Sequence, residues 1–259
     1  MRPILFSCLG CDVRSAPFFA GLGALSAYLY FRLRRRSLGL SLEDFWNLML
    51  ALMLGVFLGG VALYAALYGP GPARNLGRVL SGNGVAGGSF FGVFWGAAAA
   101  AFLFCRRRRL AFAPVADALG AAAALGLVFM RIGCLLNGCC HGRPTRLFFG
   151  VVFLDARSRV PRSLLGVPLH PSQVYEAVGA SLIFLLLRRT ALPRGRGPAP
   201  GTAFLLFVAL YASLRFATDF VRGSDPGLIR LGGLSTAQLM ALLSLVAAVA
   251  VWARRRRSA

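Results

Sequence analysis

Two arginines inside apolar segments are the residues of this chain best suited to chemistry. Arg131 and Arg215 each lie within, or at the edge of, a long hydrophobic stretch. A guanidinium is always charged and offers planar paired donors, which match the oxygens of a phosphate. An ionisable group in such a stretch is costly to bury, so it indicates function by default. Arg131 also fits an arginine that extends its side chain to a polar surface at a helix end, and the sequence leaves both interpretations open.

A polar stripe accompanies Arg215. Tyr211, Arg215, Asp219 and Arg222 follow i, i+4, i+8 and i+11 spacing, which places them on one face of a helix. Arg215 and Asp219 can form an i, i+4 ion pair, so part of the stripe can be structural. The stripe is longer than one pair requires, and we therefore expect it to line a cavity.

A second polar group opens another apolar segment, at residues 170–176. Pro171 and Ser172 are typical of a helix start. Helix capping by these two residues does not explain the four further polar side chains at the start of the same apolar segment. We expect these side chains to face the same cavity or to support the adjacent loop; they are His170, Gln173, Tyr175 and Glu176.

Three of the six cysteines lie together, next to a histidine. Thiolates and imidazole can bind zinc or another thiophilic metal, and cysteines on an oxidising side of a membrane can form disulfides. Ordinary packing of small residues is a third interpretation. We predict no metal or cofactor, with a metal site as the alternative; its ligands would be Cys134, Cys139, Cys140 and His141.

The elements that must position these residues are membrane helices. The chain has 259 residues and is 58% hydrophobic, and its 29 basic residues are all arginine against 8 acidic ones, for a formal charge of +21. Nucleic-acid-binding proteins seldom combine such charge with such hydrophobicity, so we predict no nucleic-acid partner. The composition also excludes disorder, collagen and a small disulfide-rich fold.

Seven apolar segments are long enough, or nearly so, to cross a bilayer as helices. The fifth is short and begins with polar residues. Because a spanning segment must satisfy its own backbone, the sequence predicts an all-α polytopic membrane protein that forms a single domain over residues 1–259. The predicted spans are 15–31, 45–67, 84–105, 110–133, 172–187, 201–221 and 234–253.

Arginine clusters predict the orientation. Sixteen arginines follow the first, third, fifth and seventh segments, against eleven on the opposite side. Dense basic clusters mark the cytoplasmic side, so the N-terminus is expected outside and the C-terminus inside. The longest outer loop, residues 137–171, includes an apolar and β-prone segment at 147–153, which predicts a small strand-containing periplasmic flap.

Three motifs, in order along the chain, resemble those of the bacterial prolipoprotein diacylglyceryl transferase family. Residues 170–176 are similar to the family's His-Pro-Ser-Gln-x-Tyr-Glu, and residues 211–222 to its Tyr-x-x-x-Arg-Phe-x-x-Glu-Phe-x-Arg. Residues 131–143 resemble its signature, Arg-Ile-Gly-Asn-Phe-x-Asn-Gly-Glu-x-x-Gly-Arg. Leu234-Ser-Thr-Ala-Gln238 resembles its Leu-Ser-x-Gly-Gln, and the seven-span topology with the N-terminus outside is also that of the family.

This resemblance implies a reaction and a place for it. A diacylglyceryl group would pass from phosphatidylglycerol to the lipobox cysteine thiol of a prolipoprotein, at the bacterial inner membrane, with glycerol-1-phosphate leaving. Arg131 and Arg215 would be catalytic, and the partners would be phosphatidylglycerol, prolipoprotein signal peptides and the bilayer. The implied substrate-binding residues are Asp117, Asn137, Gly142, Arg143, His170, Gln173, Tyr175, Glu176, Tyr211, Asp219, Arg222, Gly87 and Gly88.

The chain departs from the family pattern at acid–base positions. The signature asparagine and glutamate are Cys134 and Cys139, and the histidine of the third span is Ala86. The phosphate-binding arginines remain, whereas the groups that would move protons differ. Two alternatives therefore stay open: a paralogue with a thiol-redox or metal-dependent membrane role, and a protein that binds phospholipid without catalysis.

Overall fold

The computed structural model of the chain describes residues 1–8, 11–67, 90–190, 199–223 and 233–257. Within these residues it contains seven α-helices, two short 3-10 helices and one two-stranded antiparallel sheet. The helices are α1 Ser15–Arg34, α2 Leu42–Leu67, α4 Phe90–Arg107, α5 Phe112–Asn137, α6 Ser172–Thr190, α7 Thr202–Asp219 and α8 Thr236–Arg257.

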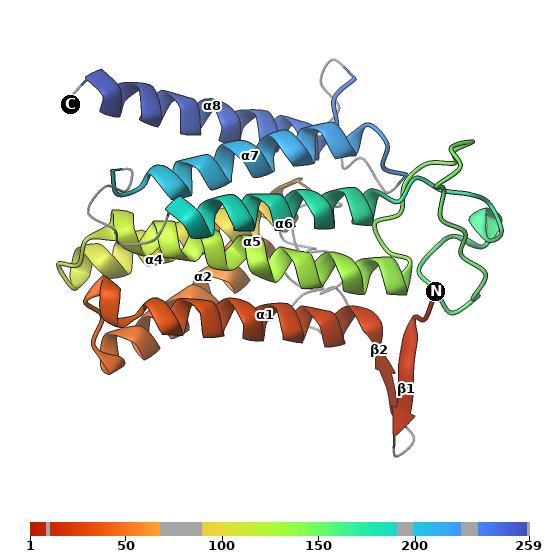
Figure 1. Cartoon of the computed structure of the whole chain (residues 1–259), viewed down its shortest axis with the longest axis horizontal. Coiled ribbons are helices and arrows are strands. Elements are labelled where there is room, and N and C mark those ends of the chain that lie inside the picture. Colours follow the sequence, from red (N-terminus) through yellow and green to blue (C-terminus); the bar gives the residue numbers. More distant parts are fainter. Residues whose placement is uncertain (9–10, 68–89, 191–198, 224–232, 258–259) are drawn as a thin grey trace.

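The helices lie side by side along the longest axis of the molecule, with the two chain termini at opposite ends (Figure 1). Helix α5 is central, since it contacts α1, α4, α6 and α7, while α2 packs on α4 and α8 packs on α7. Small residues of α5 make this possible: its alanines 118, 121, 122 and 124 are buried against neighbouring helices. Each predicted span corresponds to one helix, although residues 84–89 of the third lie outside the described residues.

Four of the helices are long and apolar enough to cross a membrane, namely α2 over Leu42–Tyr64, α5, α7 and α8. The described part of α4 begins at Phe90 and ends in two arginines, and α6 begins with polar residues. These features shorten the apolar part of both helices. The chain is therefore a multi-pass membrane protein with four clear spans.

Glycines allow α2 and α4 to approach closely. On α2, a Cβ added at Gly55 would lie 2.5 Å from a carbonyl oxygen of α4, and one added at Gly59 would lie 2.3 Å from such an oxygen. On α4, a Cβ added at Gly92 would lie 2.3 Å from a carbonyl oxygen of α2, and one added at Gly96 would lie 2.1 Å from such an oxygen. Only glycine permits this backbone contact, which is a common way for membrane helices to associate without a hydrophobic driving force. The contact pairs α2 with α4 at the edge of the bundle.

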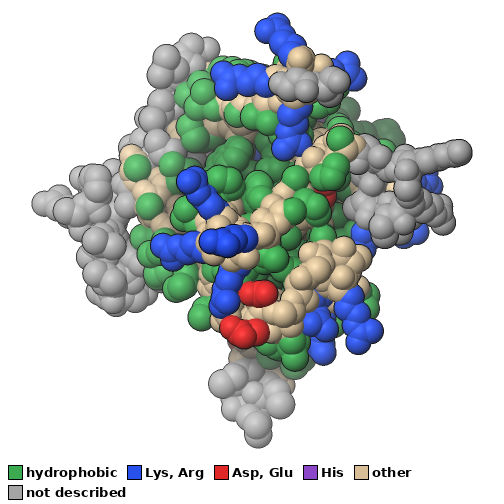
Figure 2. All heavy atoms as spheres, turned by 90° about the vertical axis from the view of Figure 1, so that its left-hand side faces the viewer, with side chains coloured by type: hydrophobic (Ala, Val, Ile, Leu, Met, Phe, Trp, Pro, Cys, Tyr) green, Lys and Arg blue, Asp and Glu red, His purple; other side chains and the backbone are tan. Residues whose placement is uncertain are grey.

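Basic side chains gather at the end of the bundle that includes the C-terminus (Figure 2). They come from the last turns of α1, α4, α6 and α8, which carry Arg32, Arg34, Arg106, Arg107, Arg188, Arg189 and Arg254 to Arg257. Basic residues in a last turn also interact favourably with the helix dipole. The clusters thus lie at one end, as the sequence pattern predicted.

The opposite end carries the connection between α5 and α6 and the N-terminal hairpin (Figure 1). The predicted strand at 147–153 does not form: this connection has turns, the short 3-10 helix Arg162–Leu164 and isolated bridges. Leu169 pairs with both Pro144 and Val151, so the backbone folds back before a strand can extend. The regular sheet is instead the hairpin of β1 Ile4–Cys8 and β2 Cys11–Arg14, which sequence analysis missed.

Candidate functional site

A buried glutamate of α6 joins the arginines of three different chain segments. The carboxylate of Glu176 lies 2.7 Å from Arg131 Nη2 of α5, 2.9 Å from Arg222 Nη1 and 3.6 Å from Arg215 Nη1 of α7. The Glu176 side chain is only 1% exposed, and those of the three arginines are 7–11% exposed. The structure thus brings together the two arginines predicted to be catalytic, through a residue predicted to belong to the substrate-binding set.

The predicted polar stripe continues this network along α7. Asp219 Oδ1 lies 2.9 Å from Arg215 Nη2 and 4.0 Å from Arg222 Nε. Its other oxygen accepts a hydrogen bond from the hydroxyl of Ser235, which precedes α8. The i, i+4 ion pair is therefore real, and it is also one link of a larger network.

Ser235 and Gln238 form a reciprocal cap at the start of α8. The backbone N–H of Gln238 donates to Ser235 Oγ at 3.1 Å, and the backbone N–H of Ser235 donates to Gln238 Oε1 at 2.9 Å. This is the capping box expected from a Ser-x-x-Gln spacing. Because Ser235 also bonds Asp219, the cap joins α8 to the arginine cluster.

The arginine cluster, defined as Arg131, Glu176, Arg215, Asp219 and Arg222, carries an excess of positive charge. Its three guanidiniums and two carboxylates leave a net charge of +1 in a buried setting. Arg131 Nε and Arg215 Nη1 have no hydrogen-bond partner among the described residues. Buried donors normally have partners, so these two groups favour an anionic ligand with oxygen acceptors.

The turn after α5 approaches the arginine cluster through close backbone contacts. Helix α5 ends at Asn137, and Gly138 has a φ of +77°, which glycine adopts readily. Gly142 donates its N–H to the His170 carbonyl at 3.1 Å, and a Cβ added to it would lie 2.4 Å from that oxygen. The buried Asn137 has an Oδ1 atom without a partner among the described residues.

The first turn of α6 holds this segment in place. Ser172 Oγ donates to the Cys140 carbonyl at 2.7 Å, and Gln173 Nε2 donates to the Cys139 carbonyl at 2.9 Å. His170 Nδ1 lies 3.4 Å from the Tyr175 hydroxyl. The polar start of α6 thus supports the adjacent loop as well as supplying Glu176.

Three thiols lie beside the arginine cluster. The Sγ atoms of Cys134, Cys139 and Cys140 all lie within 4.8 Å of one another. Hydrogen bonds from the first two thiols hold the pKa of Cys140 well below its usual value, and the charges of Arg222 and Arg131 lower it further. His141, the fourth ligand of the alternative metal site, is not part of this group: its Nδ1 lies 3.0 Å from the Gly142 carbonyl oxygen.

Asp117 lies away from the arginine cluster. Its carboxylate accepts hydrogen bonds from the backbone N–H groups of Gly201 at 2.6 Å and Phe204 at 2.7 Å, and so it caps α7 at the other end. This contact gives Asp117 a structural role that sequence analysis did not foresee, and a role in substrate binding remains only a prediction.

The remaining predicted residues have different environments. Tyr211 is buried on α7 and stacks on Phe207, with ring centroids 5.9 Å apart. Arg143 is exposed, and its Nε donates to the Arg222 carbonyl at 3.1 Å. Gly87 and Gly88, together with Ala86, lie outside the described residues.

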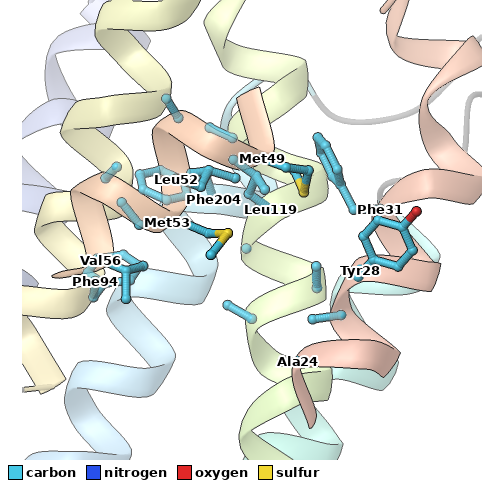
Figure 3. Close-up of a pocket in the computed structure, with 18 of the residues that line it drawn as sticks. Ala24, Tyr28, Phe31, Met49, Leu52, Met53, Val56, Phe94, Leu119 and Phe204 are labelled. Carbon is cyan, nitrogen blue, oxygen red and sulfur yellow. The ribbon is translucent and has the colours of Figure 1, made fainter. Parts of the chain in front are cut away.

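An apolar cavity of about 540 Å³ lies between α1, α2, α4 and α5, with Phe204 of α7 completing its wall. Figure 3 shows Tyr28, Met49 and Leu119 among its lining side chains. The cavity contains neither the arginines nor the thiols of the polar site. From Gly120 at its wall, α5 rises about 16 Å to reach Arg131. A polar site and an apolar cavity therefore lie at different levels along one helix.

Comparison with known proteins decides the family. The family model described as "Prolipoprotein diacylglyceryl transferase" matches residues 3–254. The chain belongs to this family. Among the proteins it is similar to is the "Phosphatidylglycerol--prolipoprotein diacylglyceryl transferase" of Geobacter sulfurreducens, 34% identical over 98% of this chain and 96% of that protein. The protein of the same name in Clostridium tetani is 28% identical over 97% of this chain and 97% of its own length. The one in Solidesulfovibrio magneticus is 35% identical over 90% of this chain and 87% of its own length.

Membership of the prolipoprotein diacylglyceryl transferase family confirms the resemblance drawn from the sequence motifs. The match extends over nearly the whole chain, so the arginine cluster, the thiols and the apolar cavity all lie within the matched region. The position of Glu176 within a seven-residue polar motif was the sequence signal for its place in the site.

Proposed function

We propose that this chain transfers a diacylglyceryl group from phosphatidylglycerol to the lipobox cysteine of a prolipoprotein. One observation carries the proposal: three largely buried arginines converge on one carboxylate with a net positive charge, and two of their nitrogens have no hydrogen-bond partner among the described residues. Such a site suits a phosphate diester held at a membrane surface. Membership of the transferase family gives the corresponding reaction.

The arginines would act on the phosphate that leaves. In the reaction, the sulfur of the acceptor attacks the glyceryl carbon that carries the phosphate, a C–S bond forms and the C–O bond breaks. The electron pair stays with glycerol-1-phosphate, and the proton of the acceptor thiol passes to solvent or to the departing phosphate. Arg131 and Arg215 would stabilise the charge that develops on the departing phosphate, and a buried site makes that stabilisation stronger than in water.

The two carboxylates of the arginine cluster would orient these arginines. Both oxygens of Glu176 contact guanidiniums, and both oxygens of Asp219 are engaged, one by arginine and one by Ser235. A general base must reach the proton that it removes. The carboxylates are thus better suited to holding the guanidiniums than to deprotonating the acceptor thiol.

The apolar cavity would receive hydrocarbon. With the headgroup at Arg131, an acyl chain directed along α5 reaches the level of Gly120, about 16 Å away. The cavity wall is formed almost entirely by alanine, methionine, leucine and aromatic side chains. Burial of acyl methylenes there is favourable by about 0.8 kcal/mol each.

The orientation follows from the arginine distribution. We propose seven spans in the bacterial inner membrane, with the arginine-rich end in the cytoplasm and the arginine cluster facing the outer leaflet. The loop 138–171 then lies outside, where a prolipoprotein signal peptide presents its cysteine. The exposed arginines would interact with anionic lipid rather than nucleic acid.

The direct test is complementation of bacterial cells depleted of their own transferase. We expect the wild-type chain to restore growth, and Arg131→Ala and Arg215→Ala to abolish rescue. In a purified assay with phosphatidylglycerol and a lipobox peptide, each variant should lose roughly 100- to 1,000-fold in rate, as loss of a transition-state donor does elsewhere.

Arg108→Ala is the matched control, because Arg108 is an exposed arginine that pairs with Glu43 and Asp44 at the other end of the bundle. This variant should retain activity. Wild-type protein that is expressed in the membrane but neither rescues nor lipidates the peptide would refute the proposed reaction. Binding of phosphatidylglycerol without turnover would then favour the non-catalytic alternative.

A further inference from the structure

The proposed transfer does not use the three-thiol group beside the arginine cluster. Cys134 lies in the last turn of α5, and Cys139 and Cys140 follow its end. Their Sγ atoms lie within 4.8 Å of one another, and all three side chains are partly buried. The fourth cysteine whose side chain is described, Cys105, is buried in a separate core cluster. The arrangement therefore concentrates soft ligands at one place.

The backbone holds these thiols together in an unusual way. Cys140 has a φ of +60°, a conformation that costs energy for a residue with a side chain. The carbonyl groups of Cys139 and Cys140 are fixed by Gln173 and Ser172 of α6. In this conformation the Cys140 Sγ lies within 4.8 Å of the other two Sγ atoms.

We propose that Cys134, Cys139 and Cys140 bind one thiophilic metal ion with a filled d shell, Cu(I) or Zn(II). Each sulfur would bind as a thiolate and form one metal–sulfur bond; any proton still on a thiol would be released to solvent, with no change in oxidation state. Soft thiolates favour these ions over magnesium or calcium. The charges of Arg222 and Arg131, which act on Cys140, would balance the negative charge of a three-thiolate site.

Such a site would connect metal binding to the arginine cluster. The metal would fix the turn after α5, and this turn is bonded to Ser172 and Gln173, three to four residues before Glu176. Asn137, whose buried Oδ1 has no partner among the described residues, lies between the first and second thiol in the sequence. The site rests on the thiol geometry alone and does not require the proposed transferase activity.

Metal binding is best measured on full-length protein that lacks the other three cysteines, C8S/C11S/C105S. The reduced protein is titrated with Zn(II), and separately with Cu(I) against a chromophoric chelator. We expect one equivalent of either ion per chain. On this background Cys139→Ser should weaken binding by at least roughly 100-fold, more than the 10–100-fold typical of residues outside the coordination shell.

Cys134→Ser and Cys140→Ser should each cause a comparable loss, and X-ray absorption of the loaded protein should show three sulfur ligands. A second measurement on the wild type covers the case in which a variant does not fold: bound metal should protect these three cysteines, identified by mass spectrometry, from alkylation. Failure of the reduced protein to take up either ion would overturn the proposal. Oxidation of two of the thiols to a disulfide, without metal uptake, would overturn it in favour of a redox pair.

Discussion

Neutralising Glu176 tests the arginine cluster most directly. Glu176→Gln keeps the shape of the side chain but removes the charge that faces Arg131 at 2.7 Å and Arg222 at 2.9 Å. The net charge of the cluster then rises from +1 to +2 in a site whose carboxylate is 1% exposed. Removing one partner of a buried ion pair costs about 3–5 kcal/mol, because the remaining charges lose their compensation. We expect a loss of this size in the free energy of unfolding.

The measurement is reversible unfolding of purified protein in mixed micelles, followed by tryptophan fluorescence and circular dichroism. Glu43→Gln is the control, since Glu43 is 76% exposed and pairs with Arg108 at 3.3 Å. An exposed pair contributes only about 0–1 kcal/mol. Equal effects of the two substitutions would refute the assignment of Glu176 as the centre of the cluster.

The anionic lipid provides a second readout on the same variant. Phosphatidylglycerol that binds folded protein stabilises it by mass action, and its phosphate would replace part of the lost negative charge. The stabilisation by phosphatidylglycerol should therefore be larger for Glu176→Gln than for the wild type, whereas transfer should be slower because Arg131 and Arg215 lose their orienting partner. Identical stabilisation of both proteins would contradict a phosphate site at these arginines.

Three further substitutions test the elements that position the cluster. Gly142→Ala should cost about 1–3 kcal/mol of stability and most of the transfer rate, because the added Cβ would lie 2.4 Å from the His170 carbonyl oxygen. Gly21→Ala is the matched control in thermal-unfolding and peptide-lipidation assays, because a Cβ added there would have no described atom within 4 Å. Asp117→Ala should lower stability by about 1–2 kcal/mol through loss of the α7 cap and leave the affinity for phosphatidylglycerol unchanged. A loss of lipid binding without a loss of stability would instead support the predicted role of Asp117 in substrate binding. Ser235→Ala should cost about 1 kcal/mol of stability at the α8 cap, and it should also reduce the transfer rate because Asp219 loses its hydroxyl partner. An unchanged transfer rate would show that the contact from α8 does not contribute to the site.

The sequence predicted the helices well because hydrophobic runs of this length have only one stable form in a bilayer. It also predicted that Arg131 and Arg215 belong to one site, through motifs rather than through spacing. The remaining geometry of the site depends on contacts between segments that lie far apart in the chain. No local pattern shows that Glu176 contacts three arginines, because two of them lie on other helices and the third follows one.

Two local environments that the sequence did not predict have specific physical causes. The apolar segment 147–153 was expected to form a strand. Among the described residues it makes only the isolated bridge between Val151 and Leu169, and its Phe148 side chain is 98% exposed. Asp117 was expected among the substrate-binding residues. Its carboxylate accepts hydrogen bonds from two backbone N–H groups at the start of α7, about 21 Å from Arg131 along α5, and its role with substrate stays a prediction. The first expectation used residue type, and the second used the resemblance to the family pattern, whereas the local contacts depend on which backbone groups lie nearby.

The contacts at the two ends of α7 also restrict how this helix can move. Asp117 bonds its first turn, and Glu176 and Ser235 hold its last turn through Arg215 and Asp219. A shift along the axis by even one residue, about 1.5 Å, would break contacts at both ends together. Axial sliding of α7 is thus an unfavourable route for exchanging one lipid for the next. Lipid turnover should depend instead on segments that lack such contacts at both ends, and the spacing of the guanidiniums should stay constant through many reaction cycles.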